Sequence, residues 1–473
     1  MSVGRLSKQI LSSAGLSAAA RLISFTGIIV YTNSVPQTTL GQYFLFVAVI
    51  STVGYLGTLG SATKVLREIS RDQESSTELT TAIVITTVVA VVFLIIAITL
   101  GPTVNGYVGR DVTTFLLVGI PAELYFQITG STLRGEKKVI RAQALDTGQI
   151  GIRYTGGVAA VAAGYDPFLS VAGSFLLGKI VHSVAAFVMI DTGLSRVEDV
   201  AGFLSDSLPM LVVRANSFGQ QWLDTLVLGF FVPEGFIAVY EVAWQLSSAA
   251  LLVVNSIMAA GFPEISDMFY KQERERARVL SEKMYFYGML PVIGFLGGAM
   301  VVGEEVLALL YGFEYTDAWL PLVILSLGRL FYVFETVSNK ILYALNEQTA
   351  SAKLAVVGST SNVVLNVALI PPLLLPGAAV ATASSYLLQA ILLVWLAIDQ
   401  SGLSLQLSQF VKPTLVTLIM MGVVYSYQGL LNDSIGTLVS SILIGVVVFV
   451  VGLWSVSSEF RNDLDRVFTA LAS

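Results

Sequence analysis

The chain has 473 residues, of which 55% are hydrophobic and only 12% are charged, with a formal net charge of −6. A soluble domain of ordinary composition carries about 25% charged residues, so this composition excludes an ordinary soluble protein. The acidic balance excludes a generally basic surface for nucleic acid. The absence of cysteine excludes disulfides, thiolate nucleophiles and cysteine-based metal sites.

Long apolar runs follow one another along the chain, and several are long enough to cross about 30 Å of hydrocarbon. The sequence therefore predicts an all-α polytopic membrane protein with fourteen transmembrane helices. The predicted spans, in chain order, are 10–32, 41–62, 79–100, 112–133, 142–164, 167–190, 207–232, 236–260, 284–302, 317–345, 351–373, 377–398, 412–430 and 435–455.

The basic residues fix the predicted orientation, because loops on the inner side are enriched in lysine and arginine. With the N-terminus inside, only Arg110 of the 26 lysines and arginines falls in an outer loop, and six lie within the spans. We therefore expect a multi-pass protein of the plasma membrane with both termini in the cytoplasm. The charged inner stretches 63–78 and 265–283 are predicted to be amphipathic helices in the membrane interface, with cations that contact lipid headgroups.

The sequence contains an internal repeat at an offset of about 193–211 residues. Arg21 in the first predicted helix matches Arg214 in the seventh, and Phe175 in the sixth matches Tyr386 in the twelfth. Such a duplication predicts two six-helix lobes around a central, cation-lined cavity. The predicted divisions are an N-terminal lobe over 1–200, its repeat over 201–400, and two further helices with a cytoplasmic tail over 401–473.

Six cations lie inside predicted spans. Each costs about 2.5–3.5 kcal/mol at the centre of a membrane helix, and such residues usually face a bundle interior or a wet cavity. We therefore expect an anionic cargo. The predicted cargo-binding residues are Arg21, Arg214, Arg329, Arg153 and Lys179. The sixth cation, Lys340, is close enough to the inner end of its span to snorkel to the surface.

Five acidic residues also lie inside predicted spans: Glu123, Asp146, Asp224, Glu241 and Glu335. A buried carboxylate that exchanges a proton or binds a cation is able to couple transport to H⁺ or Na⁺. Glu123, close after the helix-disturbing Pro121, is the first candidate for such coupling, followed by Asp224 and Glu335.

The alternative is that the intramembrane acids and cations form dry structural ion pairs, with Glu123 paired permanently to Arg153 or Arg21. The only histidine, His182, lies on an apolar helix. There we expect it to be a packed or hydrogen-bonded residue and not a ligand.

Several loose motifs recur at the ends of predicted helices, and together they cover essentially the whole chain. They are Leu40-Gly41-Gln42-Tyr43, Gly235 with Tyr240-Glu241-Val242-Ala243, Leu342-Tyr343-Ala344-Leu345 and Gly377-Ala378-Ala379-Val380-Ala381-Thr382. With fourteen helices and two repeats, the chain resembles the multidrug/oligosaccharidyl-lipid/polysaccharide (MOP) flippase superfamily. Within that superfamily it resembles the Wzx-type polysaccharide flippases.

The resemblance implies a flippase that moves a sugar or oligosaccharide, linked to a polyprenyl or dolichyl phosphate or pyrophosphate, from the inner to the outer leaflet. Its product would serve cell-surface polysaccharide or glycoprotein glycan assembly. Alternating access of the two lobes would drive the movement, and arginines would contact the phosphate. The implied partners are membrane lipids and other surface-glycan assembly proteins, without nucleic acid. No catalytic residue, metal or cofactor is implied, and coupling to H⁺ or Na⁺ stays open.

Three alternatives remain. A cation-coupled drug exporter and a peptidoglycan-precursor flippase belong to the same superfamily, although an exporter site would favour acids and aromatics over cations. A membrane glycosyltransferase, polymerase or ligase acting on lipid-linked sugars is the alternative from another class. Such an enzyme usually needs sizeable outer loops, whereas the longest outer loop predicted here, 303–316, has acidic residues but no basic or histidine partner.

Overall fold

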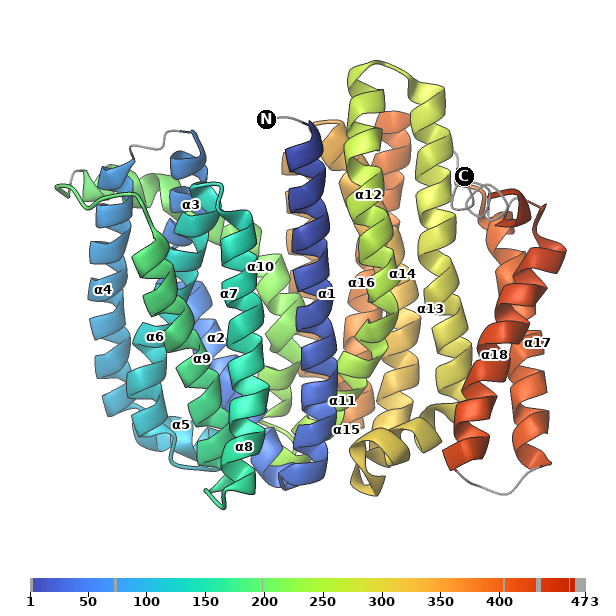
Figure 1. Cartoon of the computed structure of the whole chain (residues 1–473), viewed down its shortest axis with the longest axis horizontal. Helices are drawn as coiled ribbons and strands as arrows, with labels where there is room; N and C mark the ends of the chain where they lie inside the picture. The colour runs from blue at the N-terminus through green and yellow to red at the C-terminus, as the bar shows by residue number, and fades with distance from the viewer. Residues whose placement is uncertain are drawn as a thin grey trace. The chain divides into compact units, whose positions relative to one another are not determined.

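The structure, a computed structural model, describes residues 3–71, 75–197, 199–402, 405–430, 435–458 and 460–463 (Figure 1). The side chains of residues 3–14, 212–218 and 220 lie outside this description. Helices make up nearly all of the described residues, and none of these residues lies in a strand. The chain forms two compact units, Met1–Glu241 and Val242–Ser473.

The first unit consists of helices, most of which are joined by short turns (Figure 1). Its elements are α1 (Val3–Ser34), α2 (Gln37–Gly57), α3 (Ser61–Arg71), α4 (Ser76–Thr99), α5 (Gly101–Val108), α6 (Thr113–Gly135), α7 (Val139–Gly151), the π-helical turn η1 (Ile152–Gly156), α8 (Gly157–Ala162), α9 (Pro167–Met189), α10 (Val200–Leu228) and α11 (Glu234–Ser247). The boundary of the unit falls within α11.

The second unit is built in the same way (Figure 1). Its elements are the turn η2 (Ser248–Ala250), α12 (Leu251–Tyr270), α13 (Arg274–Tyr311), η3 (Phe313–Ala318), α14 (Trp319–Ala344), α15 (Gln348–Leu373), α16 (Leu375–Ser401), η4 (Leu407–Phe410), α17 (Val411–Gly429) and α18 (Ile435–Val456).

The prediction of an all-α polytopic membrane protein is confirmed. Within the described residues, eleven helices are long and apolar enough to cross a membrane, or up to twelve if the pair α5 and α6, bent by 97°, is one span. A helix or helical run also lies at each of the two other predicted spans, 142–164 and 207–232. The first of these runs is interrupted by η1, and both hold charged residues. The total of fourteen and the lobe boundaries therefore stay predictions.

The predicted interfacial helix at 265–283 is wrong. α12 continues to Tyr270, and after a short turn α13 begins at Arg274, so the charged stretch extends two long helices and forms no helix of its own. Gln272 in the turn has a positive φ of 60°, which reverses the chain within three residues. Charged residues are good helix formers outside the membrane, so nothing in this stretch ends either helix earlier.

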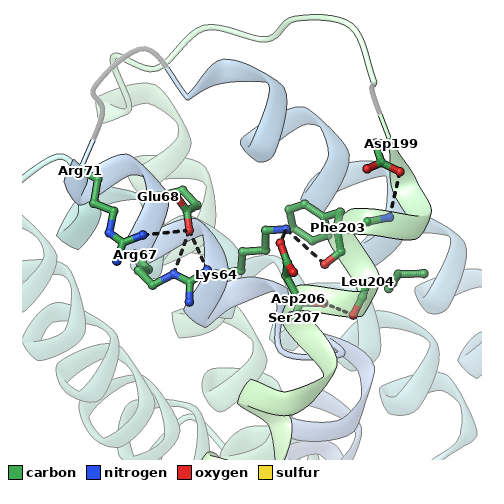
Figure 2. Close-up of polar contacts among 10 residues, drawn as sticks. Lys64, Arg67, Glu68, Arg71, Asp199, Phe203, Leu204, Asp206 and Ser207 are labelled. Atoms are coloured by element: carbon green, nitrogen blue, oxygen red, sulfur yellow. Dashed lines mark hydrogen bonds and ion pairs between the residues drawn. The ribbon is translucent and has the colours of Figure 1, made fainter.

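At the other predicted stretch, 63–78, the helix α3 ends at Arg71 and α4 begins at Ser76, so its place in the membrane interface stays a prediction, and one of its cations has a contact that was not expected. The ammonium of Lys64 lies 3.0 Å from the carboxylate of Asp206 on α10 and 4.3 Å from the ring centroid of Phe203 (Figure 2). Gly60, with φ of 77°, permits this packing, because a Cβ there would lie 2.0 Å from the carbonyl oxygen of Ser207. Lys64 therefore joins α3 to α10, and it is buried.

Aromatic residues form much of the core that surrounds the charged residues of the first unit. Tyr31, Tyr43, Phe46 and Phe168 are fully buried, and Phe175 is nearly so. Their rings meet mostly edge to face, for example Phe46 with Phe168 at 6.1 Å and Tyr43 with Phe175 at 6.3 Å. Such rings offer polarisable faces to a cation without a counter-charge.

Candidate functional site

Arg153 lies in the π-helical turn η1, where the backbone departs from α-helical geometry. Its carbonyl oxygen accepts hydrogen bonds from the Tyr31 hydroxyl and, at 2.9 Å, from Ser174 Oγ. Turns of this kind inside α-helices are frequent at functional sites. Here the turn places the side chain of Arg153 among aromatic rings.

Aromatic rings lie directly around the guanidinium of Arg153, and the buried Glu241 is near enough to interact with it electrostatically. The Cζ of Arg153 lies 5.3 Å from the ring centroid of Tyr43, 5.0 Å from that of Tyr154 and 5.3 Å from that of Phe175. No carboxylate of a described residue lies within ion-pair distance. Cation–π attraction therefore contributes to holding a positive charge that forms no ion pair with a described residue.

Lys179 on α9, by contrast, has a carboxylate partner. Its ammonium lies 3.1 Å from Glu123 on α6 and 3.4 Å from the ring centroid of Phe126. Glu123 also accepts a hydrogen bond of 2.9 Å from Gln127. The ring centroid of Phe175 lies 5.5 Å from the Lys179 ammonium and 5.3 Å from Cζ of Arg153. Three predicted site residues, Glu123, Lys179 and Arg153, therefore lie in one cluster around this ring.

The predicted ion-pair partners of Glu123 were therefore incorrect. Its partner is Lys179, and not Arg153 or Arg21, because α6 and α9 pack directly against each other. The side chain of Glu123 is buried, with an exposed fraction of 4%, and that of Lys179 is largely buried, with 11% exposed. The pair neutralises its own charges inside the first unit.

The two other predicted coupling residues lie in different units. Asp224 on α10 is buried and accepts a hydrogen bond from the Tyr240 hydroxyl on α11, next to Glu241, which accepts one from Thr225. Glu335 is buried on α14 of the second unit. Among the described residues, no three histidine, aspartate or glutamate side chains are grouped to hold a metal ion.

Among the predicted cations whose side chains the structure describes, Arg329 on α14 is the most deeply buried, with 2% of its surface exposed. Its guanidinium donates hydrogen bonds to Ser247 at 3.4 Å, to Ser248 at 2.7 Å and to the Tyr386 hydroxyl at 3.3 Å. The ring centroid of Trp244 lies 5.0 Å from its Cζ.

The contacts of the Arg329 guanidinium are thus hydroxyl groups and a ring, and not a counter-ion. No carboxylate of the described part of the chain forms an ion pair with it. Like the partly buried Arg153, it forms no ion pair with a described carboxylate, so an anionic group that enters the site would gain from neutralising it.

The remaining predicted cations are less informative. Arg21 on α1 is exposed. The backbone at Arg214 belongs to α10, but its side chain lies outside the described residues. Lys340 on α14 lies 5.1 Å from the ring centroid of Phe262.

Sequence reasoning missed the neutral partners of the two arginines. These are Tyr43, Tyr154 and Phe175 around Arg153, and Trp244, Ser247 and Tyr386 around Arg329. The sequence held one indication of these partners, because Phe175 and Tyr386 are matching positions of the repeat. In the structure, Phe175 lies against Arg153 and Tyr386 lies against Arg329. Motifs chosen for charge alone do not reveal residues that bind a cation through rings and hydroxyls.

Solved structures show which fold the chain shares. The fold is similar to a structure titled "Lipid II flippase MurJ, inward closed conformation", with a TM-score of 0.81 and 17% identity over 96% of this chain and 99% of that chain. It is also similar to an inward-facing multidrug resistance MATE family transporter of the MOP superfamily, with a TM-score of 0.65 and 15% identity over 81% and 94%. The fold is therefore that of the polytopic helical transporters of this superfamily.

Family models give the particular family. The model described as "Polysaccharide biosynthesis protein" matches residues 6–269, and the model "Lipid II flippase MurJ" matches residues 149–448. Each match covers more than half of the chain, so the chain belongs to the polysaccharide-biosynthesis and MurJ group of MOP-superfamily flippases. It is a transporter and not an enzyme.

Two curated relatives come from Haloferax volcanii. One is named "Probable low-salt glycan biosynthesis flippase Agl15" and is 25% identical over 90% of this chain and 91% of its own length. The other is named "Probable flippase AglR" and is 28% identical over 78% of this chain and 79% of its own length.

Proposed function

We propose that this flippase moves a sugar or oligosaccharide, linked to a polyprenyl or dolichyl phosphate or pyrophosphate, from the inner to the outer leaflet of the plasma membrane. Two curated relatives are named as flippases, one of them for glycan biosynthesis, which supports a lipid-linked glycan as the cargo. Cell-surface polysaccharide or glycoprotein glycan assembly would use the product, together with other assembly proteins.

The observation that carries the proposal is the environment of the buried arginines. Arg153 and Arg329 are surrounded by rings and hydroxyls instead of carboxylates. A buried cation without a counter-ion is costly, and an anionic cargo that neutralises it gains correspondingly. A phosphate or pyrophosphate suits a guanidinium because two parallel hydrogen bonds join them.

Several finer features belong to this proposal. They are fourteen spans, two six-helix lobes that alternate in access, cytoplasmic termini, and coupling to H⁺ or Na⁺ through Glu123, Asp224 or Glu335. All three carboxyl groups are buried and so are shielded from water. Arg21, Arg214 and Lys179 complete the set of proposed cargo-binding cations.

A flipping assay tests the proposal. Purified protein in vesicles is given a fluorescent polyprenyl-phosphate-linked sugar, and a membrane-impermeant quencher reports the fraction in the outer leaflet. We expect Arg329→Ala to abolish flipping and Arg329→Lys to restore part of it, because lysine keeps the charge but loses the two-pronged contact. Arg276→Ala is the matched control, since Arg276 is exposed and pairs only with Glu273.

If Arg329→Ala and Arg153→Ala both flip at the rate of the wild type while the protein is well folded, the cationic cargo site is wrong. Thermal unfolding in detergent checks the folding of each variant. Loss of flipping in Arg276→Ala to the same degree would also contradict the proposal, since the effect would then not be specific to the buried arginines.

A peptidoglycan-precursor flippase is the second candidate, because the MurJ model matches residues 149–448 and a MurJ structure has the same fold. The two candidates differ in cargo and not in mechanism. Expression of the chain in bacteria depleted of their own lipid II flippase distinguishes them: rescue of growth favours the peptidoglycan precursor. Failure to rescue, with flipping of a polyprenyl-phosphate-linked sugar in vesicles, favours the proposed function.

A further inference from the structure

The π-helical turn η1 is held by side chains from two other helices of the first unit. In an α-helix, the carbonyl of Arg153 would accept a hydrogen bond from the N–H of Gly157, but this N–H bonds to the carbonyl of Tyr154. The Arg153 carbonyl accepts hydrogen bonds from the hydroxyls of Tyr31 on α1 and Ser174 on α9, the second at 2.9 Å. Both hydroxyls belong to buried residues. Two helices that are far apart in the sequence therefore meet at the backbone of one turn.

Gly157 gives these hydroxyls their room. A Cβ at this position would lie 2.1 Å from the Tyr31 hydroxyl oxygen and 2.9 Å from Ser174 Oγ, so a larger residue would displace them. Gly27 of α1 admits the ring of Tyr154 in the same way, because a Cβ there would lie 2.2 Å from Cγ of that ring. Gly27 and Tyr31 are one helical turn apart and share one face of α1. This face of α1 thus packs against the π-helical turn at two points.

The position of the π-helical turn sets the direction of the Arg153 side chain. Such a turn holds one residue more than the α-helical turn that it replaces. Because α7 before it and α8 after it both pack against α9, the extra residue has to lie between these two helices. If the turn moved by one position, the residue that it passed would rotate by about 100°, the angle between successive residues of an α-helix. For Arg153, a rotation of this size would take the guanidinium away from the rings of Tyr43 and Phe175.

A hydrogen-bond donor from outside the helix keeps such a turn in place, because it satisfies a carbonyl that has lost its α-helical partner. We propose that Tyr31 and Ser174 are positioning residues for Arg153: their hydroxyls hold the π-helical turn at this residue and so direct the guanidinium into its cluster of rings. Gly157 is the third member, since it gives the hydroxyls access to the carbonyl. That this position of Arg153 serves phosphate binding rests on the proposed function, whereas the positioning itself does not.

The alternative is that both hydroxyls only stabilise the packing of α1 and α9 against the turn. A lower unfolding temperature in variants without the hydroxyls does not separate the two explanations, because both predict it. The direction of the Arg153 guanidinium does separate them. So does the question of whether the hydroxyls still affect cargo affinity when Arg153 is absent.

The first experiment follows Arg153 itself. The full-length protein, labelled with ¹³C- and ¹⁵N-arginine, is studied by NMR in detergent, and the Arg153 side-chain signal is assigned by its loss in Arg153→Lys. Aromatic rings shift the signals of nearby protons, so we expect the wild-type signal outside the range of exposed arginines. We expect it to move into that range in Tyr31→Phe with Ser174→Ala, and in Gly157→Ala. It should stay in place in Ser183→Ala, whose lost hydroxyl donates to a carbonyl of its own helix at 2.8 Å.

An Arg153 signal that lies in the exposed range in the wild type overturns the proposal, and this result needs no variant to fold. A ring-shifted signal that is unchanged in the folded double variant, Tyr31→Phe with Ser174→Ala, also overturns it. The two single variants are measured as well, because each removes one hydroxyl only. If the double variant does not fold, a displaced signal in the single variants supports the proposal, and an unchanged signal in both overturns it.

The second experiment measures whether the hydroxyls act through Arg153. The affinity of the purified protein for the fluorescent polyprenyl-phosphate-linked sugar is measured in detergent by fluorescence anisotropy. We expect Tyr31→Phe with Ser174→Ala to weaken binding about tenfold. In an Arg153→Ala background the same change should alter the affinity by less than about twofold, because the group that is positioned is gone. Tyr107→Phe removes a tyrosine hydroxyl that bonds to the Leu226 carbonyl, and as the matched control it should bind like the wild type.

Equal weakening in the two backgrounds overturns the positioning role, since the hydroxyls would then affect binding without Arg153. A displaced Arg153 signal together with wild-type affinity supports the positioning but overturns its link to phosphate binding. If the wild type neither binds nor moves the lipid, the proposed function fails, while the NMR signals still decide whether Tyr31 and Ser174 position Arg153.

Discussion

The carboxylate of Glu123 on α6 lies 3.1 Å from the ammonium of Lys179 on α9, and both side chains are buried. One is an intramembrane acid that the sequence suggests for ion coupling, and the other is an intramembrane cation that it suggests for cargo binding. Their pairing means that neither is available for its proposed role unless the pair opens during transport. Lys179 is therefore a weaker candidate for phosphate contact than Arg153 or Arg329.

Breaking this pair from one side should cost much more than removing both charges. Lys179→Met leaves Glu123 buried without its cation, which typically costs about 3–5 kcal/mol, whereas removal of both charges is often close to neutral. We expect Lys179→Met to lower the thermal unfolding temperature in detergent strongly, and the double variant Glu123→Gln with Lys179→Met to recover most of the loss. If the double variant loses as much stability as Lys179→Met and Glu123→Gln lose together, the two residues do not interact.

The contact between α3 and α10 should depend on its two partners unequally. Asp206 is 62% exposed in its side chain, so Asp206→Ala should cost no more than about 1 kcal/mol, as for surface ion pairs. Lys64 is 8% exposed, donates to the Phe203 carbonyl at 3.3 Å and lies over the Phe203 ring, so Lys64→Ala should cost about 1–3 kcal/mol. Thermal unfolding of both variants measures how much stability each substitution removes. An equal loss in both would show that the buried contacts of Lys64 with Phe203 do not contribute to stability.

The cysteine-free chain permits a direct test of the predicted orientation. Glu275 and Glu314 are both exposed and lie at opposite ends of the long helix α13, Glu275 in its first turn and Glu314 in η3, just beyond its last residue. The topology predicts that Glu314→Cys reacts with an impermeant maleimide in intact cells and that Glu275→Cys reacts only after the membrane is permeabilised. The reverse pattern would invert the orientation, and equal labelling of both would mean that α13 does not span the membrane.

Asp166, outside the spanning helices, should make stability depend on pH. It caps α9 by accepting a hydrogen bond of 2.9 Å from the Leu169 backbone N–H, and that bond, together with Arg110 at 2.8 Å, holds the pKa of its carboxyl below the usual value. A lowered pKa in the folded state means that the contribution to stability is complete above about pH 5 and is lost as the pH falls below about 4.

Two substitutions separate the cap from the charge. Asp166→Ala should cost about 1 kcal/mol at neutral pH because the cap is lost. Asp166→Ser keeps a capping oxygen without a charge, so at pH 7 its unfolding temperature should lie closer to that of the wild type than the unfolding temperature of Asp166→Ala does. The difference in unfolding temperature between the wild type and Asp166→Ser should become smaller as the pH falls. If the difference in unfolding temperature between the wild type and Asp166→Ser stays constant from about pH 7 to pH 3, the charge of Asp166 does not contribute to stability and this prediction is wrong.

The sequence by itself determined the class of this protein. Apolar runs such as 79–100 and 435–455 have to be helical in a membrane, because backbone groups in hydrocarbon must be hydrogen-bonded within their own segment. The same reasoning located the intramembrane charges, including Arg153, Lys179 and Arg329, and the loose motifs pointed to the MOP superfamily. These conclusions need only composition, segment length and local spacing.

Only the tertiary structure decided which of these residues meet. Glu123 pairs with Lys179, which is 56 positions away, and His182 faces Asp146, because the packing of α6, α7 and α9 sets which faces are in contact. Nor did charge patterning reveal that rings surround Arg153 or that Ser248 and Tyr386 hold Arg329. Helical periodicity specifies which residues share one face of one helix, whereas the partner of that face depends on how the helices pack, and packing is a property of the whole unit.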